Sequence, residues 1–492
     1  MRSGYSFRPV ILLFCAMLFL AFCFDISAGS IKTASFAFLL ICTVIGVCAY
    51  KSSIPAFSIF ITYLTGVFLK LSYMIYTPVW CRQHDVIDFG AGEGHAAYIE
   101  YILAHKALPD FDPRTVWAFF QPPLHHLVAA VWMWLGIRCG ITPPRLYKNV
   151  QILPFIYMCM TMYIIYMICR ELDMKKQSVL ITMLIVSFHP IYILMSASLN
   201  NDALSVMLSV AALYTAIRWY KKPGPLLISA LALVIGLSMS AKLSSVLTAI
   251  GIGPIMIYKI VKDTGAFRDK GRLLKHIRDL FIFALIVFPL GLWWTVRNSI
   301  LFNMPPTYIP EVGEQVEKFG IVPTFLDLRT ASPFLYMKAN GYGYDEYNLI
   351  LATVKSSLFG EGDFVSVSPY LTMAGWILLA AAAISLTVRL ASFIRMCAPV
   401  EGEEDKGIRL MLVSVFAVSL IGYLAFALSG KNLSAMNFRY CAAAAAVLPV
   451  CTGLWYDMLY EKGKKGACAL IMISSAAFAL SSLAFYILLG LL

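Results

Sequence analysis

The sequence predicts an all-α, polytopic membrane protein with about thirteen transmembrane helices. Of its 492 residues, 60% are hydrophobic and only 13% are charged, whereas a soluble globular protein is about 45–50% apolar and about 25% charged. A membrane-spanning helix needs about 20 consecutive, mostly apolar residues. Thirteen runs suited to this task lie near residues 9–29, 31–50, 54–77, 146–169, 178–197, 203–220, 224–241, 243–262, 279–298, 370–392, 408–429, 437–458 and 467–490.

The first run resembles a signal peptide, because it follows Arg2 and Arg8 and precedes Ser27-Ala28-Gly29. Another apolar run begins at once with Ile31, which favours an uncleaved first span. We divide the chain into N-terminal transmembrane helices (1–77), a first long loop (78–145), a central transmembrane bundle (146–298), a second long loop (299–369) and C-terminal transmembrane helices (370–492).

One ambiguous run, residues 124–137, decides the orientation of the chain. It is too short to cross a bilayer comfortably, and its tryptophans Trp132 and Trp134 are typical of the membrane interface. If it lies in the membrane plane and Met1 is cytoplasmic, more than half of the 39 basic residues fall on the cytoplasmic side, as the positive-inside rule requires. Both long loops then face outward, each carrying in-plane or short helices. We expect a multi-pass protein of the cell membrane, of the bacterial cytoplasmic type.

The net charge of +12 does not indicate nucleic-acid binding, because the basic residues occupy short loops between apolar runs and form no continuous basic face. No Cys-x-x-Cys spacing indicates a metal or redox site. We therefore predict no metal ligands, and a divalent metal or other cofactor is not indicated. A disulfide between Cys81 and Cys139, which flank the first long loop, stays open.

The stretch from Trp80 to Ile137 concentrates six of the 27 acidic residues and five of the seven histidines. Titratable groups gather in this way at functional sites. The alternative is a loop that is polar only because it is solvated. We predict that this stretch contains catalytic residues.

Three basic residues are expected at the outer rim of the bundle with almost no loop around them, namely Lys242, Arg297 and Arg439. Charges at membrane depth usually have partners or a function. One interpretation is snorkelling, or pairing with a buried carboxylate. The other is a cluster that holds a lipid phosphate, which arginine grips in a bidentate manner and lysine attracts as a point charge.

On the same side, Asn200, Asn201 and Asp202 precede the sixth span. They are typical helix N-cap residues. Equally, Asp202 could be a second carboxylate, and the asparagines could donate to a hydroxylated substrate. His189-Pro190 within the fifth span indicates a kink.

The order of elements resembles a known superfamily. An early loop Asp, Asp85, is followed by the stretch HAAYIEYILAHKALP, by Phe119-x-Gln121-Pro-Pro-Leu124 and by an in-plane helix. Lys-x-Ser at 242–244 and Arg297-Asn298 follow in the bundle. This pattern, over about 78–300, resembles the GT-C superfamily of polyprenyl-phosphate-dependent glycosyltransferases, in the protein mannosyltransferase and aminoarabinose transferase branch.

The resemblance implies that Asp85 is the catalytic carboxylate and that Lys242, Arg297 and Arg439 hold the donor phosphate. Relatives often carry Asp-Glu where this chain has Asp85-Val86, so the choice between Asp85 and Asp88 stays open. Gln121 stands where His or Tyr is common. The implied partners are a polyprenyl-phosphate sugar donor, membrane lipids, and a glycan, lipid or protein acceptor.

Displacing a lipid phosphate from an anomeric carbon needs a base near the acceptor hydroxyl and cations near the departing phosphate. Asp85 would be the base, with Asp88 or Glu93 as alternatives, and a single carboxylate acting directly predicts inversion. We expect substrate-binding roles for a further group of polar residues, His84, His95, Gln121, Asn201 and Asp202.

Three other functions stay open. A transporter or flippase of lipid-linked sugars would place charged or broken helices at the bilayer midplane. A polymerase or ligase of lipid-linked glycans typically carries its main external loop late in the chain, whereas the richer loop here comes early. A membrane scaffold with a glycan-binding loop would not be catalytic.

Overall fold

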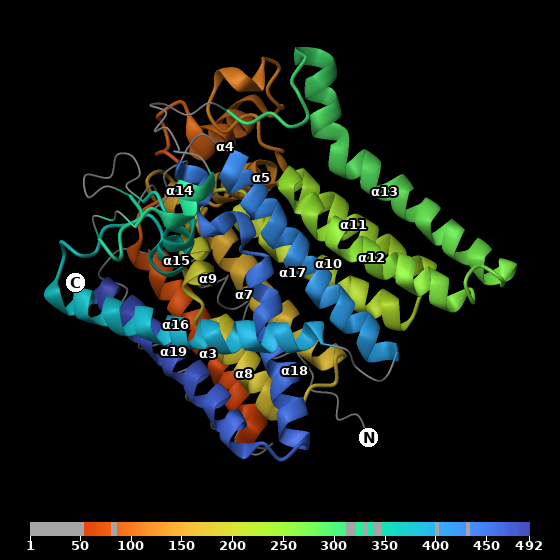
Figure 1. The fold of residues 1–492 in the computed structure, drawn as a ribbon. Helices are drawn as coiled ribbons and strands as arrows, with labels where there is room; N and C mark the ends of the chain where they lie inside the picture. Colours follow the sequence, from red (N-terminus) through yellow and green to blue (C-terminus); the bar gives the residue numbers. More distant parts are fainter. Residues whose placement is uncertain are drawn as a thin grey trace.

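The structure is a computed structural model that describes residues 54–79, 86–310, 321–328, 330, 332–337, 346–398, 403–429 and 433–492. The predicted spans at 9–29 and 31–50, and Cys81, His84 and Asp85, lie outside these residues. Within them the fold is helical, and an isolated β-bridge pairs Thr330 with Glu346. The helices form one bundle (Figure 1).

Eight helical segments of the described chain are long and apolar enough to cross a membrane, or nine if one bent pair counts as a span. The predicted number of thirteen is therefore not confirmed. The eight segments contain α3 (Ile54–Tyr76), α6 (Arg145–Asn149) with α7 (Ile152–Glu171), α10 (Asp202–Lys221), α12 (Val246–Asp263), α13 (Lys270–Phe302), α16 (Pro369–Cys397), α17 (Glu403–Ser429) and α19 (Lys465–Leu491).

The bent pair consists of α8 (Lys176–Ser187) and the segment formed by α9 (Pro190–Leu194) and η2 (Met195–Ala197), which meet at 56°. The predicted kink at His189-Pro190 is confirmed. Lys70 of α3 donates from Nζ to the Ser187 carbonyl oxygen at 2.8 Å, which satisfies the end of the broken helix. Gly66, one turn away, packs so closely that a Cβ atom there would lie 2.6 Å from Ser187 Cβ.

Two predicted spans are shorter than expected. Helix α11 (Pro225–Ala241) has 17 residues and α18 (Val447–Glu461) has 15. The segment before α18, predicted to begin a span at 437, forms the 3-10 turns η4 (Leu433–Met436), η5 (Phe438–Cys441) and η6 (Ala444–Ala446). The backbone N–H of Arg439 is donated to the Asn437 side chain, and that of Phe438 to the Ser356 hydroxyl. These partners replace the bonds of an α-helix.

The two long loops contribute short helices at one end of the bundle. The first loop contains α4 (Gly94–His105), η1 (Pro113–Thr115) and α5 (Leu124–Arg138), and the second contains α14 (Ile321–Leu326) and α15 (Leu349–Phe359). Figure 1 shows α4, α5 and α14 together at the top of the view. The bounds of α5 agree with the run predicted at 124–137; its orientation relative to a membrane stays a prediction.

Candidate functional site

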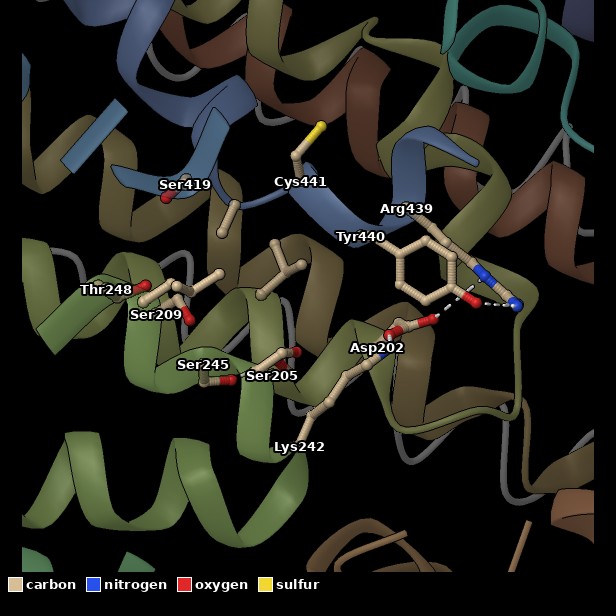
Figure 2. A pocket seen from close by; sticks show the side chains of 14 residues that line it. Asp202, Ser205, Ser209, Lys242, Ser245, Thr248, Ser419, Arg439, Tyr440 and Cys441 are labelled. Atoms are coloured by element: carbon tan, nitrogen blue, oxygen red, sulfur yellow. Dashed lines mark hydrogen bonds and ion pairs between the residues drawn. The ribbon is translucent and has the colours of Figure 1, made fainter. Parts of the chain in front are cut away.

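A polar pocket lies where the start of α10, the short turn η3 (Leu243–Ser245) that follows α11, and η5 meet (Figure 2). It encloses about 420 Å³ of empty space, part of which is open to the surroundings. Three of its lining residues are charged, namely Asp202, Lys242 and Arg439. Hydroxyl groups line much of the remainder, from Ser205, Ser209, Ser244, Ser245, Thr248, Ser419 and Tyr440.

Local backbone structure sets the position of each charged side chain. Asp202 is the first residue of α10, and its N–H is donated to the Asn200 side-chain oxygen at 3.1 Å. Asn201 occupies the N-cap position without a side-chain capping bond, and Asn200 accepts the N–H of the first helical residue instead. Lys242 ends α11 in an extended conformation, with φ −154° and ψ 120°. Arg439 lies on η5, which is tied to the second long loop because the Asn437 amide donates to Glu361 at 2.9 Å.

The carboxylate of Asp202 contacts both cations of the pocket. Lys242 Nζ donates to Asp202 Oδ1, and Arg439 Nε lies 3.8 Å from Asp202 Oδ2. Tyr440 contacts the same two cations: its ring centroid is 4.8 Å from Lys242 Nζ, and its hydroxyl accepts from Arg439 Nη2 at 3.1 Å. For Lys242 and Arg439, pairing with a buried carboxylate is therefore the arrangement found, with a net charge of +1 on the three lining residues.

Arg297 lies apart from this pair. Its Nη2 donates to the Pro109 carbonyl oxygen, its Nη1 donates to Asn298 at 2.8 Å, and its guanidinium lies 5.0 Å from the Trp294 ring centroid. It does not line the pocket. The structure thus brings two of the three predicted phosphate-binding cations together and places the third against the first long loop.

Asn201 and Gln121 connect the first long loop to the edge of the pocket. Asn201 Nδ2 donates to the Ala241 carbonyl oxygen at 2.6 Å and lies 3.3 Å from Gln121 Oε1. Ala241 immediately precedes Lys242. The stretch Phe119–Leu124 is therefore anchored beside the residue that supplies one of the two cations.

A buried group of histidines continues this connection. His95 Nδ1 and His126 Nε2 share a hydrogen bond of 2.8 Å between α4 and α5. His125 Nε2 donates to the Leu199 carbonyl oxygen at 2.7 Å, just before the Asn200–Asp202 stretch. Burial lowers the pKa of His125 to about 4 and that of His126 well below its usual range. These rings are neutral near pH 7 and act as hydrogen-bonding supports.

Of the two catalytic carboxylates predicted in the first loop, Asp85 and Asp88, the structure describes only Asp88. Asp85 and His84 lie outside the described residues. The next residue, Val86, is fully buried, and its carbonyl oxygen accepts from Ala96 N–H at 3.1 Å. Asp88 is exposed and accepts from Phe89 N–H at 2.8 Å. Neither Asp88 nor the exposed Glu93 lines the pocket.

Some features of the site had weak signals in the sequence. The two histidines that follow Pro122-Pro123 mark the start of α5, but nothing local indicates their partners on α4 and before α10. The pocket serines look like ordinary small residues of apolar helices. Across the part of the chain that the structure describes, no group of three or more His, Cys, Asp or Glu side chains is arranged to hold a metal ion.

Comparisons with solved structures find weak similarity to membrane transferases. ArnT from Cupriavidus metallidurans bound to undecaprenyl phosphate aligns at 13% identity and a TM-score of 0.49, covering 87% of this chain and 76% of that one. The Archaeoglobus fulgidus oligosaccharyltransferase in complex with zinc and sulfate aligns at 14% identity and a TM-score of 0.48, covering 86% of this chain and 53% of that one.

A second structure from that organism, the oligosaccharyltransferase AglB with an inhibitory peptide and a dolichol-phosphate, aligns at 14% identity and a TM-score of 0.47. This alignment covers 87% of the present chain and 55% of AglB, so the chain spans about half the length of either archaeal protein.

The family of dolichyl-phosphate-mannose-protein mannosyltransferases matches residues 146–294, which include Asp202 and Lys242. No curated protein matches significantly. The resemblance stated from the sequence is therefore confirmed for residues 146–294, which match the model of the dolichyl-phosphate-mannose-protein mannosyltransferase family.

Proposed function

We propose that this membrane protein transfers a sugar from a polyprenyl-phosphate donor to an acceptor hydroxyl on the extracytoplasmic side, with inversion at the anomeric carbon. The observation that carries the proposal is the half-buried pair Lys242 and Arg439, which line one pocket at an end of the bundle. The match of residues 146–294 to the mannosyltransferase family supports it independently.

The reaction needs a base and a stabilised leaving group. A carboxylate removes the proton of the acceptor hydroxyl, and the oxygen attacks the anomeric carbon from the side opposite the phosphate. The bond from that carbon to the phosphate oxygen breaks, and the phosphate keeps the electron pair. Its charge grows during this step, so Lys242 and Arg439 stabilise the transition state more than the bound donor.

We assign the base to Asp85, with Asp88 and Glu93 as alternatives. Support comes from the connections of its neighbour, because buried Val86 is bonded to the first turn of α4. From there the hydrogen bonds of His95 with His126, and of His125 with Leu199, lead to the start of α10, where the pocket begins. Gln121 and Asn201 would orient the sugar or the acceptor beside this path.

The test is a transfer assay with the purified full-length protein in lipid nanodiscs. Candidate polyprenyl-phosphate sugars are added, and released polyprenyl phosphate is measured. Loss of a general base typically costs about 10²–10⁴ in rate, so Asp85→Asn should fall by this amount. The matched control is Asp112→Asn, whose carboxylate pairs with Arg114 in the same loop; it should retain activity. Full transfer by Asp85→Asn would contradict the assignment.

One observation favours a second candidate, a transporter of lipid-linked sugars. Transporters often contain broken helices with polar groups inside the bundle, and α8 and α9 are bent by 56° beside buried Lys70. Liposomes that contain the protein and a fluorescent lipid-linked sugar distinguish the two functions. Movement of the lipid between leaflets without release of polyprenyl phosphate would favour transport.

A further inference from the structure

Asp202 lies in the part of the pocket that the proposed function gives to a phosphate. Its side chain is buried, and each of its carboxylate oxygens faces one cation, Lys242 at Oδ1 and Arg439 at Oδ2 (Figure 2). It also begins the 20-residue helix α10, where the helix dipole favours negative charge. The pocket therefore already contains one internal anion.

The carboxylate of Asp202 lowers the positive charge around a phosphate bound in the pocket. The charged lining residues are two cations and one carboxylate, which leaves +1, and without Asp202 the same lining would carry +2. A polyprenyl-phosphate sugar is a phosphodiester with one negative charge. The product is a phosphomonoester with a second pKa of about 6, so it carries nearly two negative charges above neutral pH. Donor and product therefore differ by about one charge at the same atoms.

We infer that Asp202 is a specificity-determining residue that selectively weakens binding of the dianionic monoester at the phosphate site. The two cations attract both phosphates, and Asp202 repels both. Because the product carries about twice the charge of the donor, repulsion from Asp202 weakens its binding more and promotes its release. This inference rests on the proposed function, because it assumes that the phosphate of the donor lies at Lys242 and Arg439.

The expected size of the effect follows from Coulomb's law. One additional charge about 5 Å from a carboxylate, at an effective dielectric constant of about 20, changes a binding constant by more than a hundredfold before salt screening. Screening by mobile ions reduces this value. We expect Asp202 to weaken monoester binding about tenfold or more beyond its effect on the diester.

Two probes with the same lipid chain isolate the phosphate charge, namely citronellyl phosphate and its methyl diester. Their affinities are measured by microscale thermophoresis at pH 7.5 with the full-length protein in nanodiscs. Asp202→Asn should gain affinity for both probes, and its gain for the monoester should exceed its gain for the diester about tenfold or more. An equal change for both probes, or a weaker monoester affinity, would overturn the inference.

Three controls keep the test decisive. Asp112→Asn removes a carboxylate paired with Arg114 outside the pocket, and it should leave both affinities unchanged. Thermal unfolding of Asp202→Asn shows whether the variant is folded. If it is not, Asp202→Ser replaces it in the same measurement. At pH 5, where the monoester carries about one charge, the excess gain for the monoester should disappear.

The outcomes separate the inference from the proposed function. Equal gains for both probes in Asp202→Asn would overturn the role of Asp202 and leave the phosphate site in place. Binding of neither probe would overturn the phosphate site together with the inference.

Discussion

Two lysines of the bundle, the fully buried Lys70 and the half-buried Lys242, show how the same residue type serves different purposes in this molecule. Lys242 bonds to the carboxylate of Asp202 and lines a polar pocket. Lys70 bonds to the backbone carbonyl of Ser187 at the break between α8 and α9, and it does not line that pocket. No carboxylate pairs with Lys70 within the described ranges.

The difference indicates where function is to be sought. A lysine that donates to a carbonyl oxygen at a helix end, away from the pocket, stabilises the fold. A lysine beside a pocket, with a carboxylate and an arginine as neighbours, can exchange partners when an anion arrives. Burial of a charge is therefore a weak indicator of a site, and access to a pocket is the stronger one.

The largest expected effect separates the two lysines directly. Lys242→Met should lower sugar transfer per folded molecule by about 10²–10³, because it removes one stabilising charge from the departing phosphate. Its Tm should fall as well, because buried Asp202 loses its closest cation. Lys70→Met should lower Tm and leave transfer per folded molecule unchanged, since the Ser187 carbonyl loses its partner. Both properties are measured on the same nanodisc preparations, and equal loss of transfer per folded molecule in both variants would remove the distinction between the lysines.

The two arginines give a smaller contrast. Arg439 lines the pocket, whereas Arg297 contacts the Pro109 carbonyl oxygen outside it. Replacing Arg439 by Lys removes a charge-assisted hydrogen bond worth about 1.5–3 kcal/mol, so kcat/KM should fall roughly ten- to hundredfold.

The matched variant Arg297→Lys should change kcat/KM much less. Steady-state kinetics with a lipid-linked sugar donor measures both variants. A larger effect at Arg297 would return that residue to the phosphate site predicted from the sequence.

The smallest effect concerns pH and the histidine support. The pKa of His125 is lowered to about 4 in the folded protein from an ordinary value of 6.5. The unfolded chain therefore binds a proton first as the pH falls, so the stability contribution is complete above pH 6.5 and is lost between pH 6.5 and 4. The loss is at most on the order of 3 kcal/mol.

We expect Tm to fall in that pH interval. His125→Gln should lower Tm at pH 7 while making the fall at acid pH shallower, since the variant lacks the titrating group. A pH dependence of Tm in His125→Gln that is as steep as in wild type would assign the effect to another group.

The sequence predicted some elements well because their signals are local. The break at His189-Pro190 follows from proline's missing N–H, and the bounds of α5 follow from a bounded apolar run. The segment 437–446 was mispredicted as the start of a span. Its alanines favour an α-helix, but the segment forms 3-10 turns. There the Asn437 side chain accepts from the Arg439 N–H, and the hydroxyl of Ser356, which is distant in sequence, accepts from the Phe438 N–H.

The site was predictable only in part for the same reason. The unusual positions of Lys242 and Arg439 could be recognised from the sequence, because charge at the end of an apolar run is rare. Their pairing with Asp202 depends on how α10, α11 and η5 pack, and no local pattern reports it. Arg297 had the same sequence signal, yet the structure places it against the first loop.

The most direct test of the phosphate site is a structure of the full-length protein in nanodiscs with polyprenyl phosphate added, determined by electron cryo-microscopy. If Lys242 and Arg439 form the phosphate site, phosphate density should lie within hydrogen-bonding distance of both Lys242 Nζ and the Arg439 guanidinium. Phosphate density at another place, with the contacts of Lys242 and Arg439 to Asp202 unchanged, would contradict it.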